Sequence, residues 1–203
     1  MTMKIPTALF VTATLLTALA GCAGTSSVPP SLQSTTAVTL LVEQDGKFIA
    51  VVGPRRQHAE PFLGVPGTNY HALRSWIDRR NGEAVHQLYV EDSYFGAERN
   101  WAAARDAKGQ ELRFIAINKN EITCDNGCSY AEEFAAALPE ALLRANPQGK
   151  LGGFAITFAA RSGAQQTIVV PGDLVAKQLA AIADARTVKP VAAAAAPPPN
   201  PVR

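Results

Sequence analysis

Hydrophobic and polar positions alternate over much of the chain, and short glycine-containing segments interrupt the alternation. The clearest case is the pair of runs 70–79 and 84–92, which flank Asn81 and Gly82. Alternation with a period of two is typical of a strand with one buried face, and Asn-Gly favours a type I′ turn. The pattern therefore predicts an antiparallel hairpin with a two-residue turn.

Four further hairpins are predicted by the same signals. The predicted pairs are 38–43 with 47–53, 99–104 with 110–118, 122–124 with 128–137, and 150–161 with 165–170. Both faces of the run 110–118 are largely apolar, which favours a central strand over an edge strand. Residues 130–137 contain alanines and glutamates that favour helix, but the tight turn before them favours a strand.

The segments outside these hairpins carry helix and loop signals. Pro139 opens a short predicted helix that ends near residue 145, because proline is tolerated in the first turn. Asp173 is the predicted N-cap of a longer helix over 174–185. Residues 54–70 contain several prolines and glycines, so we expect a long irregular loop there.

Together these elements predict one domain of the α+β class over residues 37–186. Its antiparallel β-sheet is built from hairpins, and the C-terminal helix packs on the sheet. An all-β sandwich is the alternative. The segment 22–36 is rich in Ser, Thr, Gly and Pro, which predicts a flexible tether, and the Ala/Pro-rich segment 187–203 is predicted to be a disordered tail.

The N-terminal region has the layout of a secretory signal. The basic residue Lys4 precedes an uncharged apolar run that ends in Leu19-Ala20-Gly21-Cys22. A membrane-spanning helix is the alternative, but the run is at the lower length limit for a span and contains Pro6. The tetrapeptide resembles the lipobox of bacterial lipoprotein signal peptides, and every position of that motif is matched.

The lipobox resemblance implies a covalent form and a location. It implies cleavage of the signal peptide 1–21, a diacylglycerol thioether on the Cys22 sulfur and acylation of the new amino group. Several acyl chains anchor a protein stably where one chain does not. Ala23 stands where an aspartate favours retention in the inner membrane, so the expected location is the inner leaflet of the outer membrane, facing the periplasm.

Composition limits the expected partners. The chain has 203 residues with 19 basic and 17 acidic side chains, a formal net charge of +2. A near-neutral chain lacks the excess of basic residues that attracts nucleic acid, so no nucleic acid is expected as a partner. The expected partners are the membrane, through the lipid, and an envelope protein or glycan.

Cys124 and Cys128 are the cysteines that remain after Cys22. They flank a short predicted turn that can set them at disulfide distance, and an oxidising compartment favours that bond. A zinc site would need two more ligands, and a redox pair is typically separated by two residues rather than three. We therefore predict a structural disulfide, with no metal and no cofactor.

The predicted turn at Asn81 and Gly82 places polar and aromatic side chains on one face of the hairpin. In the resulting register, Arg74 lies beside Tyr89 and Trp76 lies beside Gln87. Aromatic residues and arginine are frequent interface anchors, and aromatic faces also stack on sugars. These four residues are a candidate binding surface. The alternative is a second small core, covered by the 54–70 loop or by the C-terminal helix.

No group of titratable residues in the sequence has catalytic spacing. His58, His71 and His86 show no shared metal or nucleophile–base pattern, and His86 falls on the predicted core face. Glu91-Asp92 and Glu132-Glu133 are adjacent pairs, whose members point to opposite faces of a strand, so we expect solvated charges. No catalytic residue is assigned, and an enzyme whose site is assembled from distant positions stays an open alternative.

Four short segments within residues 70–175 together resemble segments of a known group of proteins. They are Trp76-Ile77-Asp78, His86-Gln87-Leu88-Tyr89-Val90, Asp92-Ser93-Tyr94, and the Cys124/Cys128 pair with Ser129-Tyr130. Their combination resembles a group of uncharacterised Gram-negative envelope lipoproteins, which implies no particular activity. We therefore expect a lipid-anchored envelope protein with a non-catalytic binding or structural role. The alternatives are an enzyme acting on an envelope polymer, of the glycan hydrolase type, and a carrier of a small apolar ligand.

Overall fold

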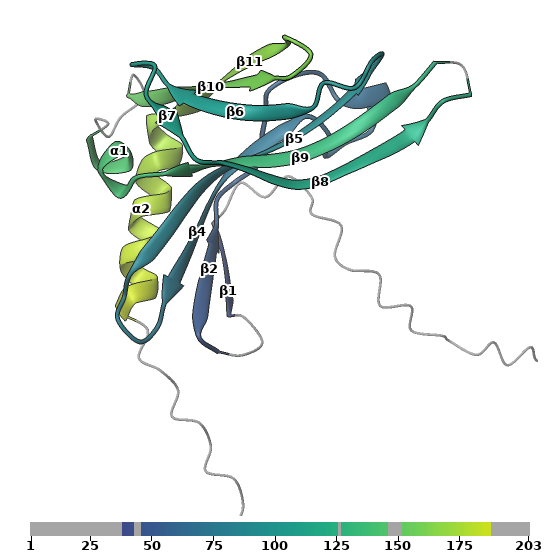
Figure 1. Ribbon diagram of the computed structural model, residues 1–203. Helices are drawn as coiled ribbons and strands as arrows, with labels where there is room; N and C mark the ends of the chain where they lie inside the picture. The colour runs from purple at the N-terminus through teal and green to yellow at the C-terminus, as the bar shows by residue number, and fades with distance from the viewer. Residues whose placement is uncertain (1–37, 43–45, 126, 146–151, 188–203) are drawn as a thin grey trace, which may run out of the picture. The chain divides into compact units, whose positions relative to one another are not determined.

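The computed structural model describes residues 38–42, 46–125, 127–145 and 152–187, all within one compact unit (Figure 1). The predicted signal peptide, the tether with Cys22, and the tail from residue 188 lie outside the described residues. Within the described ranges, no helix has the length and apolar character needed to cross a membrane.

Two antiparallel sheets form the described part of the chain. The larger has seven strands in the order β1-β2-β4-β5-β9-β8, with β3 beside β4, and the smaller has four in the order β11-β10-β6-β7. The strands of the larger sheet are β1 (Thr39–Val42), β2 (Phe48–Val52), β3 (Arg56–Gln57), β4 (Tyr70–Asp78), β5 (Ala84–Phe95), β8 (Phe114–Thr123) and β9 (Ser129–Leu138). Those of the smaller are β6 (Trp101–Asp106), β7 (Glu111–Leu112), β10 (Gly153–Ala160) and β11 (Gln165–Pro171). The helical elements are η1 (Phe62–Gly64), α1 (Glu140–Ala145) and α2 (Gly172–Thr187).

The main hydrophobic core lies between the two sheets, and α2 packs against it (Figure 1). Val90 of β5 and Phe134 of β9 meet Phe158 of β10 and Leu174 of α2 in this core. The rings of Phe134 and Phe158 pack edge to face with their centroids 5.0 Å apart. The predicted α+β class, an antiparallel sheet with a C-terminal helix packed on it, is confirmed.

A buried glutamine fixes α2 to the larger sheet. The Nε2 atom of Gln178 donates to the carbonyl oxygen of Val51 at 3.0 Å and to Oγ of Ser75 at 3.0 Å. The same Oγ lies 2.9 Å from Nδ1 of His86, which is buried on this face as predicted. Because α2 occupies this face of β4, it does not cover the side chains on the opposite face.

The β4–β5 hairpin has the predicted faces, but its predicted register was wrong. Arg74 lies opposite Gln87 rather than Tyr89. The turn is longer than two residues, because the backbone N–H of Asp78 donates to the carbonyl of Glu83 at 2.8 Å and closes it there. The two-residue shift leaves every side chain on its predicted face, since alternation along a strand has a period of two.

The run 110–118 divides between the two sheets, and its prediction as a central strand was wrong. Its first part forms β7, and its second part begins β8, which is an edge strand of the larger sheet. The β8–β9 register shifts twice, between Ala116 and Asn118 and between Glu121 and Thr123. Such bulges are common on edge strands, where they hinder pairing with another chain.

The predicted loop after β2 contains a short continuation of the sheet. The N–H of Gly53 donates to the carbonyl of Leu73 at 2.8 Å, and Arg56 of β3 then pairs with His71 of β4. Strands β2 and β3 therefore follow the same side of β4, with a break between them. This continuation places His58 near the end of β5 that carries the buried polar residues.

Candidate functional site

Three carboxylates are buried in the β5–β9 part of the larger sheet. The exposed fractions of Asp92, Glu132 and Glu91 are 3%, 5% and 9%. Asp92 and Glu132 lie opposite each other in the β5–β9 pairing and so share one face. The prediction that these residues are solvated charges was wrong. β5 continues past the predicted strand end to Phe95, so Asp92 lies in the interior of a strand.

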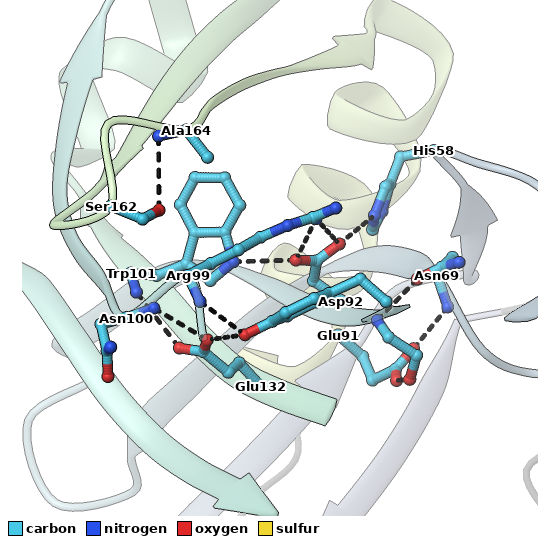
Figure 2. Close-up of polar contacts among 12 residues, drawn as sticks. His58, Asn69, Glu91, Asp92, Arg99, Asn100, Trp101, Glu132, Ser162 and Ala164 are labelled. Atoms are coloured by element: carbon cyan, nitrogen blue, oxygen red, sulfur yellow. Dashed lines mark hydrogen bonds and ion pairs between the residues drawn. The ribbon is translucent and has the colours of Figure 1, made fainter. Parts of the chain in front are cut away.

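Asp92 is held by side chains from two other segments (Figure 2). Nη1 of Arg99 donates to its two carboxylate oxygens at 3.0 and 2.7 Å, and the indole N–H of Trp101 donates to Oδ2 at 2.8 Å. Nε2 of His58 lies 4.0 Å from Oδ1. Burial alone would raise the pKa of Asp92, but His58, Arg99 and Trp101 lower it overall. Asp92 is therefore a fixed, charged group.

Glu132 accepts hydrogen bonds from the segment that leads into β6. The backbone N–H groups of Asn100 and Trp101 donate to its carboxylate at 3.0 and 3.1 Å, and the hydroxyl of Tyr94 donates to Oε1. A buried carboxylate with three donors has its charge largely compensated. Glu132 thus fixes the backbone at the start of β6.

Glu91 points to the opposite face of β5 and fixes the residue that precedes β4. Its carboxylate accepts the backbone N–H of Asn69 and the hydroxyl of Ser93. The Asn69 side chain accepts the N–H of Ser93 at 2.7 Å and donates to the carbonyl of Glu60 at 2.7 Å. Burial raises the pKa of Glu91. Asn69 is thereby held at the rim of the adjoining cavity.

A cavity of about 410 Å³ opens beside this network. Its walls come from the segment before β4, from β5, from the start of β6 and from the beginning of β11. The lining includes Asn69, Asp92, Arg99, Trp101, Gln165 and Gln166. Figure 2 shows the indole of Trp101 pointing toward the β10–β11 turn, with the Arg99 guanidinium beside Asp92. We call this hollow the Asp92 cavity.

Backbone hydrogen bonds hold two walls of the Asp92 cavity together. The N–H of Ser162 donates to the carbonyl of Arg99 at 3.2 Å, and the N–H of Arg161 donates to that of Asn100 at 2.9 Å. The guanidinium of Arg99 stacks 4.1 Å from the ring centroid of Tyr94. The segment that carries Arg99 and Asn100 is thus joined to the β10–β11 turn.

The predicted binding group lies on the other face of β4 and β5. Tyr89 is buried, and its hydroxyl donates to Oε2 of Glu133 at 2.5 Å. The Arg74 guanidinium lies 3.3 Å from the centroid of the Tyr89 ring, while Trp76 and Gln87 are half-buried. Burial raises the pKa of Tyr89, and the Glu133 contact raises it further. The four residues share a face, and Tyr89 is covered in part by Arg74 rather than by α2.

Two histidines that are distant in the sequence meet behind Asp92. The ring centroids of His58 and His71 are 6.2 Å apart, and none of their ring nitrogens has a hydrogen-bond partner among the described residues. Burial lowers the pKa of His71 to about 4, and His58 and Arg56 contribute to the shift. Across the described ranges, no three or more His, Cys, Asp or Glu residues form a group that could hold a metal ion.

Cys124 and Cys128 form a disulfide at the end of the β8–β9 hairpin, as predicted. Thr123, the last residue of β8, pairs with Ser129, the first residue of β9. The bond thus closes the hairpin just beyond its last strand pair. It does not contribute to the lining of the Asp92 cavity.

Comparison of the chain with known protein families, with curated proteins and with solved structures finds no match. The proposals below therefore rest on the chemistry of the chain's own residues. The Asp92 cavity could have been suspected from one sequence signal. Asp92 is followed directly by Ser93 and Tyr94, so the polar residue falls within a run that can continue as a strand.

Proposed function

We propose that this protein is a lipid-anchored, periplasm-facing envelope protein that binds an envelope component, without catalysis, in the Asp92 cavity. The observation that carries the proposal is this cavity of about 410 Å³, in whose wall Asn69, Asp92 and Trp101 are held by buried hydrogen bonds. Its volume falls in the range of about 300–1,000 Å³ that is common for ligand sites. The lipobox ending in Cys22 supports the location.

The state of the carboxylates favours binding over catalysis. Both oxygens of Asp92 already accept hydrogen bonds from Arg99, and one accepts a further bond from Trp101. Glu91, whose pKa is raised, is not among the residues that line the cavity. A general acid or base must reach the reacting group with an available proton or lone pair. Asp92 lines the cavity, but its lowered pKa makes it a weak base without a proton to donate, and Glu91 does not reach the cavity.

An enzyme acting on an envelope polymer is the second candidate. The observation that favours it is the pairing of Asp92 with Glu132 across β5 and β9, because two carboxylates on one face are the minimum for glycoside hydrolysis. A carrier of a small apolar ligand has less support, since Asn69, Gln165 and Gln166 make the wall polar.

The test is cosedimentation of the full chain, purified from membranes in detergent, with the insoluble envelope polymer of the same cells. Gln166→Trp places a large side chain at the cavity wall, and Gln110→Trp makes the same change at an exposed turn. We expect wild type and Gln110→Trp to sediment with the polymer and Gln166→Trp to stay in solution. Thermal melting shows that each variant is folded.

Four results would overturn the proposal. Wild-type protein that does not sediment with the polymer does not bind it, and folded Gln166→Trp that sediments like wild type does not use the cavity. Soluble fragments released from the polymer over time would indicate the enzyme. A loss of binding in Gln87→Trp, with Gln166→Trp unaffected, would move the site to the face that carries Arg74 and Tyr89.

A further inference from the structure

We propose that the Asp92 cavity is a site for a neutral saccharide. This inference rests on the proposed function and names the class of ligand. It follows from the charge of the cavity, from the hydrogen-bonding groups that face it and from the way its aromatic residue is fixed.

The wall of the Asp92 cavity is electrically balanced. Of the described residues that line it, only Asp92 and Arg99 are charged, and they form an ion pair at 2.7 Å. An anionic ligand at the free Nε and Nη2 edge of Arg99 would lie close to the carboxylate of Asp92, and it would approach the buried carboxylate of Glu132 behind the pair. A cationic ligand would meet the guanidinium, which is the more exposed member of the pair. A ligand of either charge would meet a like charge at this wall, so the wall favours a neutral ligand.

The uncommitted polar groups at the wall both donate and accept hydrogen bonds. The side-chain amide of Gln166, on the same face of β11 as the buried Ile168, has no hydrogen-bond partner within the described part of the chain, and neither do Nε and Nη2 of Arg99. An amide supplies donors and an acceptor, and a guanidinium edge supplies donors only. A hydroxyl can pair with either kind of group. Several hydroxyls on one small ring therefore suit this wall better than an apolar molecule does.

Trp101 contributes a preorganised aromatic edge. Its indole N–H donates to Oδ2 of Asp92 at 2.8 Å, and its ring centroid lies 5.2 Å from that of Phe134. The ring therefore cannot turn to hydrogen-bond a ligand, and with an exposed fraction of 6% it presents only a small part of its surface at the wall. The C–H groups of a sugar ring can contact this edge of Trp101 while its hydroxyls reach the Gln166 amide and the Arg99 guanidinium. Ala59 and Ala164 add little bulk to the wall and leave room for a ring.

The experiment measures binding of three oligosaccharides of equal length and different charge to the full chain in detergent by isothermal titration calorimetry. The probes are the neutral trimer of N-acetylglucosamine, its cationic deacetylated form and an anionic trimer of galacturonate. We expect the neutral trimer to bind at least about tenfold more tightly than either charged trimer. That difference corresponds to the loss of one or two hydrogen bonds or to an unpaired charge.

Variants place the binding in the cavity. Gln166→Ala should weaken binding of the neutral trimer about five- to tenfold, because one neutral hydrogen bond is removed. Gln110→Ala, at an exposed turn, should leave binding unchanged. Both variants alter side chains without hydrogen-bond partners in the described chain, so the fold should persist, and thermal melting checks it.

Several outcomes would overturn the inference. They are no binding of the neutral trimer, tighter binding of a charged trimer, or equal binding by wild type and Gln166→Ala. If the envelope polymer still sediments wild type but not Gln166→Trp while no trimer binds, the proposed function holds and the ligand class is wrong. If neither measurement shows binding at the cavity, both proposals fail.

Discussion

Arg99 and Asp92 form an ion pair in which the two partners have unequal access to solvent. The guanidinium Nη1 lies 2.7 Å from Oδ2 of the carboxylate, and the side chains are 33% and 4% exposed. The buried carboxylate therefore depends on a cation that is itself near the cavity surface. Breaking the pair from the arginine side leaves a charge in the interior, whereas most surface ion pairs can be broken at little cost.

Arg99→Ala should destabilise the protein by about 2–4 kcal/mol. Asp92 would keep the indole N–H of Trp101 but lose its charged donor, and an uncompensated buried charge costs several kcal/mol. Urea denaturation followed by tryptophan fluorescence measures the change. Arg105→Ala is the matched control, because Arg105 pairs with Glu111 at the surface, and it should cost less than about 1 kcal/mol. Equal losses of stability in the two variants would contradict the conclusion that Arg99 compensates the buried charge of Asp92.

Gly153→Ala should be strongly destabilising. Gly153 has a φ of +141°, and a Cβ atom added there would lie 2.3 Å from the carbonyl oxygen of Val170. The clash is with backbone of the paired strand β11, so it cannot be relieved by a side-chain rotation. Gly163→Ala, in the β10–β11 turn, has a φ of +89° but open space around the added atom. We expect a loss of at least about 3 kcal/mol for the first substitution and about 1–2 kcal/mol for the second, measured by urea denaturation.

The protein should lose stability as the pH falls from about 6.5 to about 4. His71 has its pKa lowered to about 4 by burial, with contributions from His58 and Arg56, whereas an unfolded chain binds the proton near pH 6.5. In this window the unfolded state binds more protons, so stability rises with pH. The contribution of His71 is full above pH 6.5 and reaches about 3 kcal/mol at most.

Comparison with His71→Leu isolates this effect, because other groups also titrate in the window. The raised pKa of Glu91 acts with the opposite sign, since protonation of that carboxyl is easier in the folded state. The difference in unfolding free energy between wild type and His71→Leu should therefore change with pH between 6.5 and 4 and be constant above pH 7. A constant difference over the whole range would show that His71 does not carry the effect.

The local pattern of hydrophobic and polar residues was sufficient to predict most strands and both helices. The alternation around Phe154 and Phe158 indicates β10 because each strand residue is buried or exposed by its position alone. Gly163 and Gly127 likewise mark turns that the structure contains, since both have positive φ. The register of β4 and β5 could not be obtained in this way. It depends on a longer turn closed between Asp78 and Glu83, and this closure competes with the two-residue turn that Asn-Gly favours.

The candidate site was not predictable from local patterns, because it is assembled from segments far apart in the chain. An acidic residue in a strand is predicted to be exposed unless its hydrogen-bond donors are known. Asp92 is buried only because Arg99 and Trp101 supply donors, and the β10–β11 turn then packs over them. For the group of Arg74, Trp76, Gln87 and Tyr89, the placement was predicted correctly but the binding site was not found. The sequence correctly places the four side chains on one face, but a face alone does not define a cavity.

Replacement of Cys22 tests the predicted lipidation and membrane location of the protein. If the lipobox directs lipidation, cells grown with radioactive palmitate should label the wild-type chain and not Cys22→Ala, since the thioether and the acylated amino group both depend on that residue. Cys124→Ser is the matched control. It removes a cysteine that is disulfide-bonded in the folded domain and should leave both the label and the membrane association unchanged. Palmitate labelling of Cys22→Ala equal to that of wild type would rule out the lipoprotein assignment, and with it the membrane tether on which the proposed location depends.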